Sequence, residues 1–292
     1  MQYSFPHYLL SKQSVDDRAL NRVVLDALKV NLPSPPIRII EVGAGIGTML
    51  ARLLRWDIVT RLDYVLVDKI NENMEMAREW IPHWALEAGF STEEMGDDQL
   101  RVFDKTHDLH AHFVHADVFD FIRENPAPAD LLIAHAFLDL LPMPDSTPKL
   151  FSLTRNLAWL TINFDGVTSL EPTIDVELDE QIERLYHATM NTRTTGGDSH
   201  TGRLLLSSLQ RLGTEVLAAG ASDWVVYAKN GKYPADEAYF LHFILHFFEE
   251  SLTGQPGLDP IAFSNWLKQR RAQIERGELV YVTHQMDVLA RV

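Results

Sequence analysis

Apolar and polar residues alternate along the first half of the chain in a pattern typical of strands and helices in turn. Apolar residues at helical spacing predict a helix over residues 14–30, and the prolines within 31–36 end it. Residues 37–42 (IRIIEV) indicate a buried strand, and residues 48–56 the next helix. Four further buried strands are expected at 64–68, 112–117, 129–137 and 157–165. Five buried strands alternating with helices predict a parallel, doubly wound α/β sheet.

The pattern changes after Gly166. An amphipathic helix is expected over residues 174–190, and the polar residues 191–201, which contain Gly196 and Gly197, predict a loop. We expect the whole insertion 174–201 to act as a mobile gate, because a glycine pair bends at little cost. The other expected elements are a helix at 202–213, strand material at 214–228 broken at Gly220, helices at 236–252 and 259–277, and a last strand at 279–292.

Composition narrows the class of protein. The 292 residues are 46% hydrophobic and 23% charged, which is typical of a globular protein large enough to bury a full core. The net charge of −15 disfavours nucleic acid and anionic membrane surfaces as partners. The absence of cysteine excludes disulfides, thiolate zinc sites and a cysteine nucleophile. Because no signal peptide or membrane span is visible, a cytoplasmic protein is expected, and its oligomeric state stays open.

A glycine-rich loop joins the first predicted strand to the helix that follows it. Its sequence is Glu41-Val42-Gly43-Ala44-Gly45-Ile46-Gly47. Glycine permits positive φ and close approach of a ligand, and a helix N-terminus offers free N–H groups, so the loop predicts a ribose or anion site. The fingerprint of dinucleotide-binding proteins would require a further glycine at position 48, which is Thr48.

This loop resembles motif I of the class I S-adenosylmethionine-dependent methyltransferases, in which an acidic residue precedes G-x-G-x-G. The resemblance implies a Rossmann-like, seven-stranded sheet of order 3-2-1-4-5-7-6 with helices on both faces and helical cap insertions. Within the chain, it implies an N-terminal helical cover at 1–36 and a methyltransferase domain at 37–292, with insertions at about 167–200 and 232–277. The N-terminal helix and the helical insertion before the final strand resemble the branch that contains ubiquinone and menaquinone biosynthesis methyltransferases.

The resemblance also implies a cofactor and the residues that bind it. The cofactor would be S-adenosylmethionine, with S-adenosylhomocysteine as the product. Asp68, at the end of the second strand, would bind the ribose hydroxyls, and Asp117 would bind the adenine amino group. The complete set of expected cofactor-binding residues is Glu41, Gly43, Ala44, Gly45, Gly47, Asp68, Lys69, Asp117, Val118 and His135.

Methyl transfer from a sulfonium needs alignment and exclusion of water, so no conspicuous motif for the reaction is expected. The sequence AHAFLDLLP stands after the fourth strand in place of an Asn-Pro-Pro-Tyr-like segment, which disfavours methylation of nucleic-acid bases. The expected acceptor is therefore a small molecule. His135 and His187 are candidate general bases. Phe137, Tyr186, His187 and Arg193 are candidate acceptor-binding residues, because ligands bind beyond the carboxyl ends of the strands and in the following insertion.

Several alternatives stay open. The chain could be a non-enzymatic S-adenosylmethionine-binding regulatory or partner protein, since no base is obvious, or, less favoured, a nicotinamide-dependent oxidoreductase. Two histidine groups, at 107–115 and at His242 with His246, lack a full ligand set, so no metal is expected. Trp224 and the phenylalanine-rich helix at 236–252 could be core or could line an apolar acceptor pocket.

Overall fold

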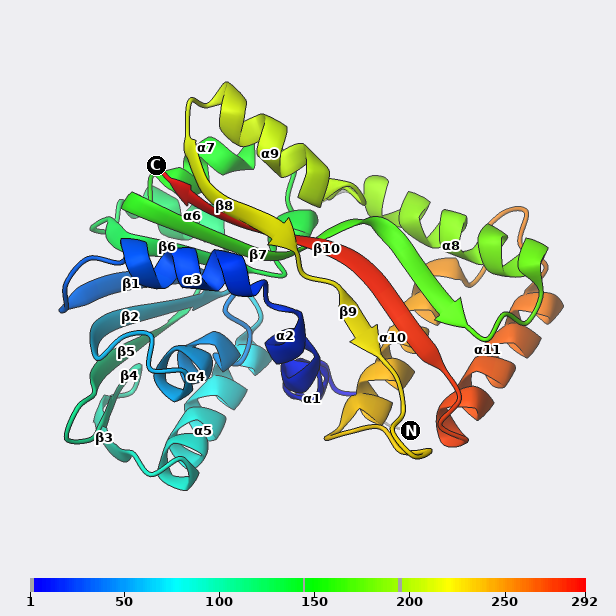
Figure 1. The fold of residues 1–292 in the computed structure, drawn as a ribbon, viewed down its shortest axis with the longest axis horizontal. Helices are drawn as coiled ribbons and strands as arrows, with labels where there is room; N and C mark the ends of the chain where they lie inside the picture. Colours follow the sequence, from blue (N-terminus) through cyan, green and yellow to red (C-terminus); the bar gives the residue numbers. More distant parts are fainter. Residues whose placement is uncertain (1–2, 144, 194–195) are drawn as a thin grey trace.

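A computed structural model describes residues 3–143, 145–193 and 196–292 (Figure 1). A single sheet runs through the molecule in the order β3-β4-β5-β2-β1-β6-β7-β10-β8, and β9 pairs with β10. Its strands are β1 Ile37–Val42, β2 Arg61–Asp68, β3 Ser91–Gly96, β4 Gln99–Phe103, β5 Asp108–His115, β6 Ala129–His135, β7 Thr154–Glu171, β8 Glu215–Ala221, β9 Trp224–Val226 and β10 Val280–Arg291.

The Rossmann-like α/β fold is confirmed, and the strand count is corrected. The strands β5, β2, β1, β6 and β7 are parallel neighbours, and β10 and β8 continue the sheet in antiparallel fashion. This part of the sheet has the expected order 3-2-1-4-5-7-6. However, the described strands number ten and not seven, because the hairpin β3–β4 extends one edge and β9 forms a separate strand. The sequence STEEMG of β3 is polar and mostly exposed, so it carries no strand pattern.

The helices are α1 Phe5–Ser11, α2 Gln13–Ala19, α3 Arg22–Asn31, α4 Thr48–Arg55, α5 Asn71–Glu87, α6 Val118–Arg123, the short 3-10 helix η1 Leu138–Leu140, α7 Ser146–Phe151, α8 Val176–Asn191, α9 Thr201–Arg211, α10 Glu237–Leu252 and α11 Pro260–Glu275. The single helix expected at 14–30 is two helices. The chain breaks at Leu20 and Asn21, and the Asn21 side chain caps α3 by accepting a hydrogen bond from Val24 N at 3.1 Å. A capping side chain competes with a continuous helix, which explains the break.

Alternate residues of the central strands face two apolar cores. Ile37 and Ile39 of β1 belong to the core under α3, α4 and α5, which continues to α10 and α11. Ile40 and Val42 belong to the core under α6, α7 and α9. The helices therefore cover both faces of the sheet, as expected. Most of the phenylalanine-rich helix α10 is buried in the first core.

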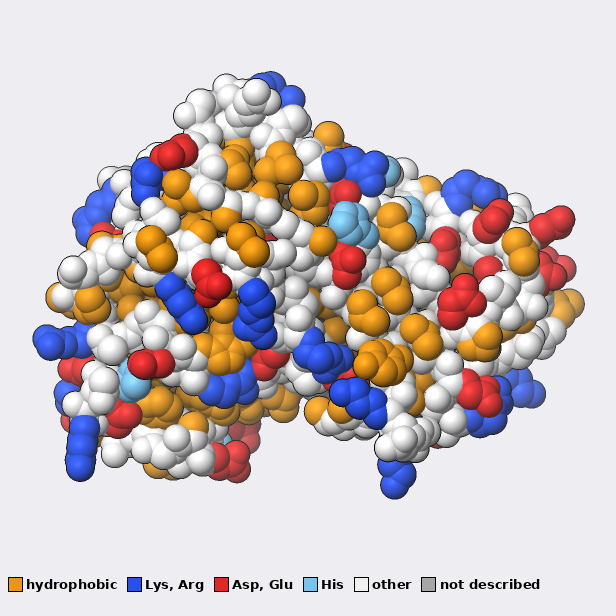
Figure 2. Space-filling view, in the orientation of Figure 1, with side chains coloured by type: hydrophobic (Ala, Val, Ile, Leu, Met, Phe, Trp, Pro, Cys, Tyr) orange, Lys and Arg blue, Asp and Glu red, His pale blue; other side chains and the backbone are white. Residues whose placement is uncertain are grey.

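The strands β7 and β10 extend beyond the parallel part of the sheet as a long ribbon, beside which α8, α10 and α11 lie (Figure 1). β7 thus continues through Gly166, where the sequence pattern suggested that the strand ends. The helices α1 and α2 lie between the parallel part of the sheet and this ribbon (Figure 1). At the lower edge of the view, the molecular surface is hollowed at this place (Figure 2). The strand material at 214–228 divides at Ser222 and Asp223, not at the predicted Gly220.

Candidate cofactor site

The glycine loop joins β1 to α4 with three left-handed residues. Gly43, Gly45 and Gly47 have φ values of 64°, 57° and 79°. A Cβ atom at position 43 would lie 2.2 Å from Cδ2 of Phe137, and one at position 47 would lie 2.7 Å from Cδ1 of Ile81. Side chains therefore do not fit at these two positions, for reasons of both backbone conformation and space.

A cavity of about 140 Å³ opens beside this loop, at the carboxyl ends of β1, β2, β5 and β6. In parallel α/β sheets, ligands bind at this edge. The structure brings almost all the expected cofactor-binding residues together here: Glu41, Gly43, Ala44, Gly45, Asp68, Lys69, Asp117, Val118 and His135 line the cavity. Gly47 is not among the lining residues and lies at the start of α4. Phe137, expected on the acceptor side, also lines the cavity.

The carboxylate of Asp68 is buried and holds the loop in place. Its Oδ2 atom accepts a hydrogen bond from Gly45 N at 2.8 Å, and Oδ1 accepts one from Ile70 N at 2.8 Å. Asp117 is exposed and caps α6, because its Oδ1 atom accepts a hydrogen bond from Phe119 N at 2.9 Å. Both carboxylates thus lie at the strand ends where the sequence placed them, in the same cavity.

Glu41, which lines the cavity, has a pKa far above its usual value. Burial raises its pKa to about 8, although a hydrogen bond from Tyr64 and the positive charge of Arg52 act in the opposite direction. Tyr64 Oη donates that hydrogen bond to Oε2 of Glu41 at 2.7 Å. At neutral pH the side chain is therefore mostly protonated, and a cation placed beside it would favour the charged form.

Three residues of the N-terminal cover also line the cavity: Phe5 and Leu9 of α1, and Lys12, which lies between α1 and α2. The sequence suggested that this segment covers the site, but no motif singled out these side chains. Leu9 lies over the glycine loop, since a Cβ atom at position 45 would be 3.0 Å from its Cδ1 atom. The cover is thus part of the cavity wall.

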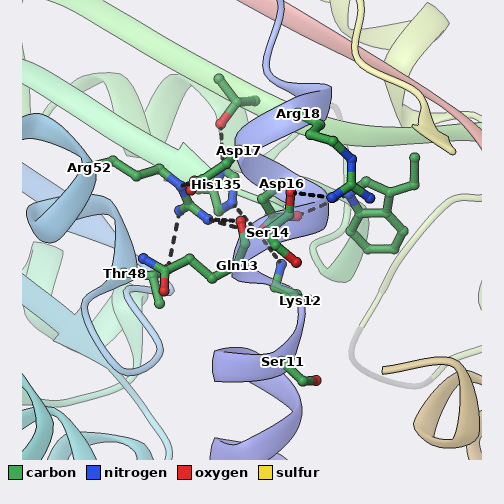
Figure 3. Close-up of polar contacts among 12 residues, drawn as sticks. Ser11, Lys12, Gln13, Ser14, Asp16, Asp17, Arg18, Thr48, Arg52 and His135 are labelled. Atoms are coloured by element: carbon green, nitrogen blue, oxygen red, sulfur yellow. Dashed lines mark hydrogen bonds and ion pairs between the residues drawn. The ribbon is translucent and has the colours of Figure 1, made fainter. Parts of the chain in front are cut away.

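A buried polar cluster joins this cover to the strands beneath it (Figure 3). Asp16 of α2 is completely buried, and it contacts side chains from three other parts of the chain. His135 Nε2 lies 3.0 Å from Asp16 Oδ2, Arg52 lies 3.3 Å from it, and Trp224 Nε1 donates to Oδ1 at 2.9 Å. Burial alone would raise the pKa of Asp16, but Lys12 and His135 outweigh it and hold that pKa well below its usual value.

The contacts of His135 change the role that the sequence suggested for it. Its Nδ1 atom lies 2.8 Å from Thr161 Oγ1 and its Nε2 atom 3.0 Å from Asp16, so both ring nitrogens have partners. Burial lowers its pKa to about 4, against the opposing effect of Asp16. His135 is therefore neutral at pH 7, and it has no free nitrogen with which to take a proton from an acceptor.

The acceptor-side residues expected from the insertion do not line the cavity. Tyr186 is buried and stacks on Phe248 with ring centroids 4.0 Å apart. His187 lies in a separate depression, where its Nε2 atom is 3.0 Å from Thr168 Oγ1. Arg193 is exposed and does not line the cavity either. Of the four candidates, the structure places only Phe137 at the cavity.

The expected gate loop passes against η1. A Cβ atom at Gly196 would lie 2.5 Å from Pro142 N, and one at Gly197 would lie 3.0 Å from the Asp139 carbonyl oxygen. Residues 194 and 195, in the middle of the predicted loop, lie outside the described residues. The motion of this insertion stays a prediction.

The histidine groups have separate partners. His107 lies beside Asp104 and Asp57, His112 beside Asp63, and His242 beside Glu275. Over residues 3–143, 145–193 and 196–292, no three histidine or acidic side chains are arranged to hold a metal ion. Within the same ranges, no helix is both long and apolar enough to cross a membrane.

Comparison with known proteins gives the fold. No protein-family model matches the chain, and no curated protein matches it. A cyclopropane-fatty-acyl-phospholipid synthase-like protein from Lactobacillus casei is similar in structure, with a TM-score of 0.52, 10% identity, and 99% of this chain and 94% of that chain covered. A candidate methyltransferase from Bacillus halodurans is also similar, with a TM-score of 0.50, 11% identity, and 93% of this chain and 99% of that chain covered. At these identities the likeness concerns the fold alone, which is a Rossmann-like α/β fold.

A third solved structure is an S-adenosylmethionine-dependent methyltransferase from Thiobacillus denitrificans in complex with S-adenosylhomocysteine. Its TM-score is 0.49, with 12% identity and full coverage of both chains. The likeness to the first two structures confirms the expected Rossmann-like fold. The likeness to the ubiquinone and menaquinone branch stays a prediction.

Proposed function

We propose that this chain is an S-adenosylmethionine-dependent methyltransferase that acts on a small-molecule acceptor. The observation that carries the proposal is the convergence of the glycine loop, Asp68 and Asp117 on one cavity at the carboxyl ends of parallel strands. The tight turns at Gly43 and Gly45 would accept the amino-acid end of the cofactor at close range. Asp68 would bind the ribose diol, with Lys69 beside it, and Asp117 with Val118 would bind the adenine.

The lining residues suit this cofactor in chemical terms. Carboxylate oxygens accept hydrogen bonds from a cis-diol and from an exocyclic amine, which are the polar groups at the nucleoside end. The apolar side chains of Phe5, Leu9 and Phe137 would surround the reactive part and exclude water. When bound, the cofactor supplies an electrophilic methyl group. The protein would then contribute mainly alignment of the acceptor, with 1–36 and the two insertions as cover.

A nucleophile with a free lone pair needs no base for this reaction, so the pairing of both nitrogens of His135 does not count against it. His187 lies in a separate depression and does not line the cavity, so it is not proposed as a base. Nucleic acid and anionic membranes are not proposed as partners, because the net charge of −15 repels both.

One observation favours a second function. Neither candidate base presents a free nitrogen to the cavity, and a protein that only binds the cofactor would need none. The alternative is therefore a non-enzymatic S-adenosylmethionine-binding regulatory or partner protein. The nicotinamide-dependent oxidoreductase is disfavoured by Thr48, which stands where the dinucleotide fingerprint has glycine.

Two experiments separate these functions. Calorimetry with S-adenosylhomocysteine and with NAD tests the ligand, and we expect binding of the first and none of the second. Incubation with radiolabelled S-adenosylmethionine and a panel of small amines, hydroxyl compounds and thiols then tests methyl transfer. Binding without labelled product across the panel would favour the non-enzymatic protein, whereas tight NAD binding without a response to S-adenosylhomocysteine would contradict both.

A further inference from the structure

Lys12 places a buried ammonium group in the wall of the cavity. Lys12 is 6% exposed, and it lines the cavity from the junction of α1 and α2. Its Nζ atom lies 3.2 Å from Asp16 Oδ2 and 5.4 Å from the centroid of the Trp224 ring. An ammonium group has three donors, and burial of such a charge is costly unless partners satisfy them.

Asp16 does not satisfy this ammonium group alone. The same carboxylate contacts Arg52, His135 and Trp224, so Lys12 shares it with three other side chains (Figure 3). Arg52 and Arg55 also contact Asp17. The cluster thus combines three cations, Lys12, Arg52 and Arg55, with the two carboxylates of Asp16 and Asp17. These five side chains together carry a net positive charge, and Lys12 is the member that lines the cavity.

We propose that Lys12 binds the carboxylate of the cofactor's amino-acid end, so that the N-terminal cover recognises whether that carboxylate is present. This inference rests on the proposed function. Lys12 and Lys69 are the two cations among the described lining residues, and Lys69 directly follows Asp68, at the end proposed for the ribose. Lys12 instead lies beside His135, since both side chains contact Asp16 Oδ2. The charge of Lys12 also acts on Glu41, and both His135 and Glu41 line the cavity.

The consequence is a specificity that the glycine motif alone does not supply. Ligands that lack the carboxylate leave Lys12 with only the shared carboxylate of Asp16, so they bind more weakly even when their nucleoside part fits. Because Lys12 belongs to the cover, its contact with the ligand also couples cofactor binding to the closed position of α1 and α2.

The first test uses the unmodified protein and three ligands: S-adenosylhomocysteine, its carboxamide, and 5′-methylthioadenosine, which lacks the amino-acid end. Calorimetry at pH 7 is expected to show about ten- to hundredfold weaker binding of the carboxamide than of S-adenosylhomocysteine, as for the loss of a charge-assisted hydrogen bond. Equal affinities for these two ligands would overturn the inference. Failure of all three ligands to bind would instead overturn the proposed function.

The second test assigns the effect to Lys12. In Lys12→Met, the preference for S-adenosylhomocysteine over the carboxamide is expected to fall to less than threefold, while the affinity for 5′-methylthioadenosine stays nearly the same. Lys12→Arg keeps the charge and is expected to keep most of the preference. Arg55→Met is the matched control, because it removes one positive charge from the same cluster at a residue that does not line the cavity.

The outcomes separate three roles. If Lys12→Met weakens all three ligands equally, the residue only holds the cover in place. If it leaves all three affinities unchanged but raises the KM of a carboxylate-bearing acceptor, the ammonium group serves the acceptor and the inference is wrong. Should Lys12→Met not fold, Lys12→Arg and the ligand series on the unmodified protein still decide.

Discussion

The carboxylate of Asp68 and the backbone N–H of Gly45 are joined by a 2.8 Å hydrogen bond. This bond ties the end of β2 to the loop after β1, and the Ile70 N–H holds the other carboxylate oxygen at the same distance. Each oxygen of a carboxylate can accept two hydrogen bonds, and Oδ1 accepts its second from Asn73 Nδ2 at 3.3 Å. Asp68 is therefore fixed in orientation before a ligand binds, and Oδ2 keeps a lone pair for a ribose hydroxyl.

Asp68→Asn is expected to weaken binding of S-adenosylhomocysteine by about 1–3 kcal/mol, because one acceptor oxygen and the negative charge are lost. Calorimetry measures this change, and thermal unfolding measures the cost to the fold. Asp63→Asn is the matched control, since Asp63 lies on the same strand and pairs with Arg38 and His112 away from the cavity. An unchanged affinity with a collapsed Tm would mean that Asp68 is purely structural.

The buried cluster predicts a large stability effect at Asp16. Asp16→Ala is expected to destabilise the protein by about 3–5 kcal/mol, because Arg52 and Lys12 would lose a shared buried counterion and Trp224 Nε1 its acceptor. Urea denaturation at pH 7 measures the change. The neighbouring Asp17 is partly exposed, so Asp17→Ala is expected to lower the free energy of unfolding by clearly less than Asp16→Ala does. Equal costs for the two variants would contradict this description of the cluster.

The parts of the site that the sequence predicted are those fixed by local chain geometry. The glycine loop needs positive φ at Gly43, Gly45 and Gly47, and this requirement is visible in the residue types themselves. Asp68 ends β2 and Asp117 follows β5 by two residues, so the parallel sheet brings them to one edge. Most of the expected cofactor-binding residues therefore line one cavity.

The contacts that sequence reasoning missed connect distant segments. Asp16 and His135 are 119 residues apart, and nothing in their local sequence pairs them. Asp287 is similar: its buried carboxylate accepts hydrogen bonds from Ile162 N at 2.7 Å and Asn21 N at 2.8 Å. Ile162 has a φ of 56°, unusual for a β-branched residue, and it lies where β7 and β10 change register. Such bulges follow from tertiary contacts, not from a pattern of apolar residues.

Two glycines of the loop are expected to respond differently to alanine. In Gly43→Ala the new methyl group would clash with the Phe137 ring, which lines the cavity. The free energy of ligand binding should therefore fall by more than the free energy of unfolding. In Gly47→Ala it meets Ile81 and Leu66, which are fully buried, so the fold should lose about 2–4 kcal/mol from backbone strain and overpacking. Urea denaturation and calorimetry on both variants check this, and identical profiles would contradict it.

Glu41 predicts a pH dependence of stability with a defined sign. Burial raises its pKa to about 8 from a reference value of 4.5, so the folded protein binds this proton more tightly than the unfolded chain does. The contribution of this protonated carboxyl to the free energy of unfolding is fully present below about pH 4.5 and is lost as the pH rises toward 8. His135, with a pKa lowered to about 4 from 6.5, acts in the opposite direction, but only below about pH 6.5.

Between pH 6.5 and pH 8, Glu183 also titrates, because burial raises its pKa to about 7. Only the difference between the unmodified protein and Glu41→Gln therefore isolates Glu41. Across this pH range, the unmodified protein is expected to lose about 2 kcal/mol more unfolding free energy than Glu41→Gln, whose amide does not ionise. Urea denaturation at pH 6.5, 7.2 and 8.0 measures the difference between the two proteins. Glu72→Gln on the exposed side of α5 is the control, and it should follow the unmodified protein. Parallel pH profiles for Glu41→Gln and the unmodified protein would show that the Glu41 carboxyl is already ionised at pH 6.5.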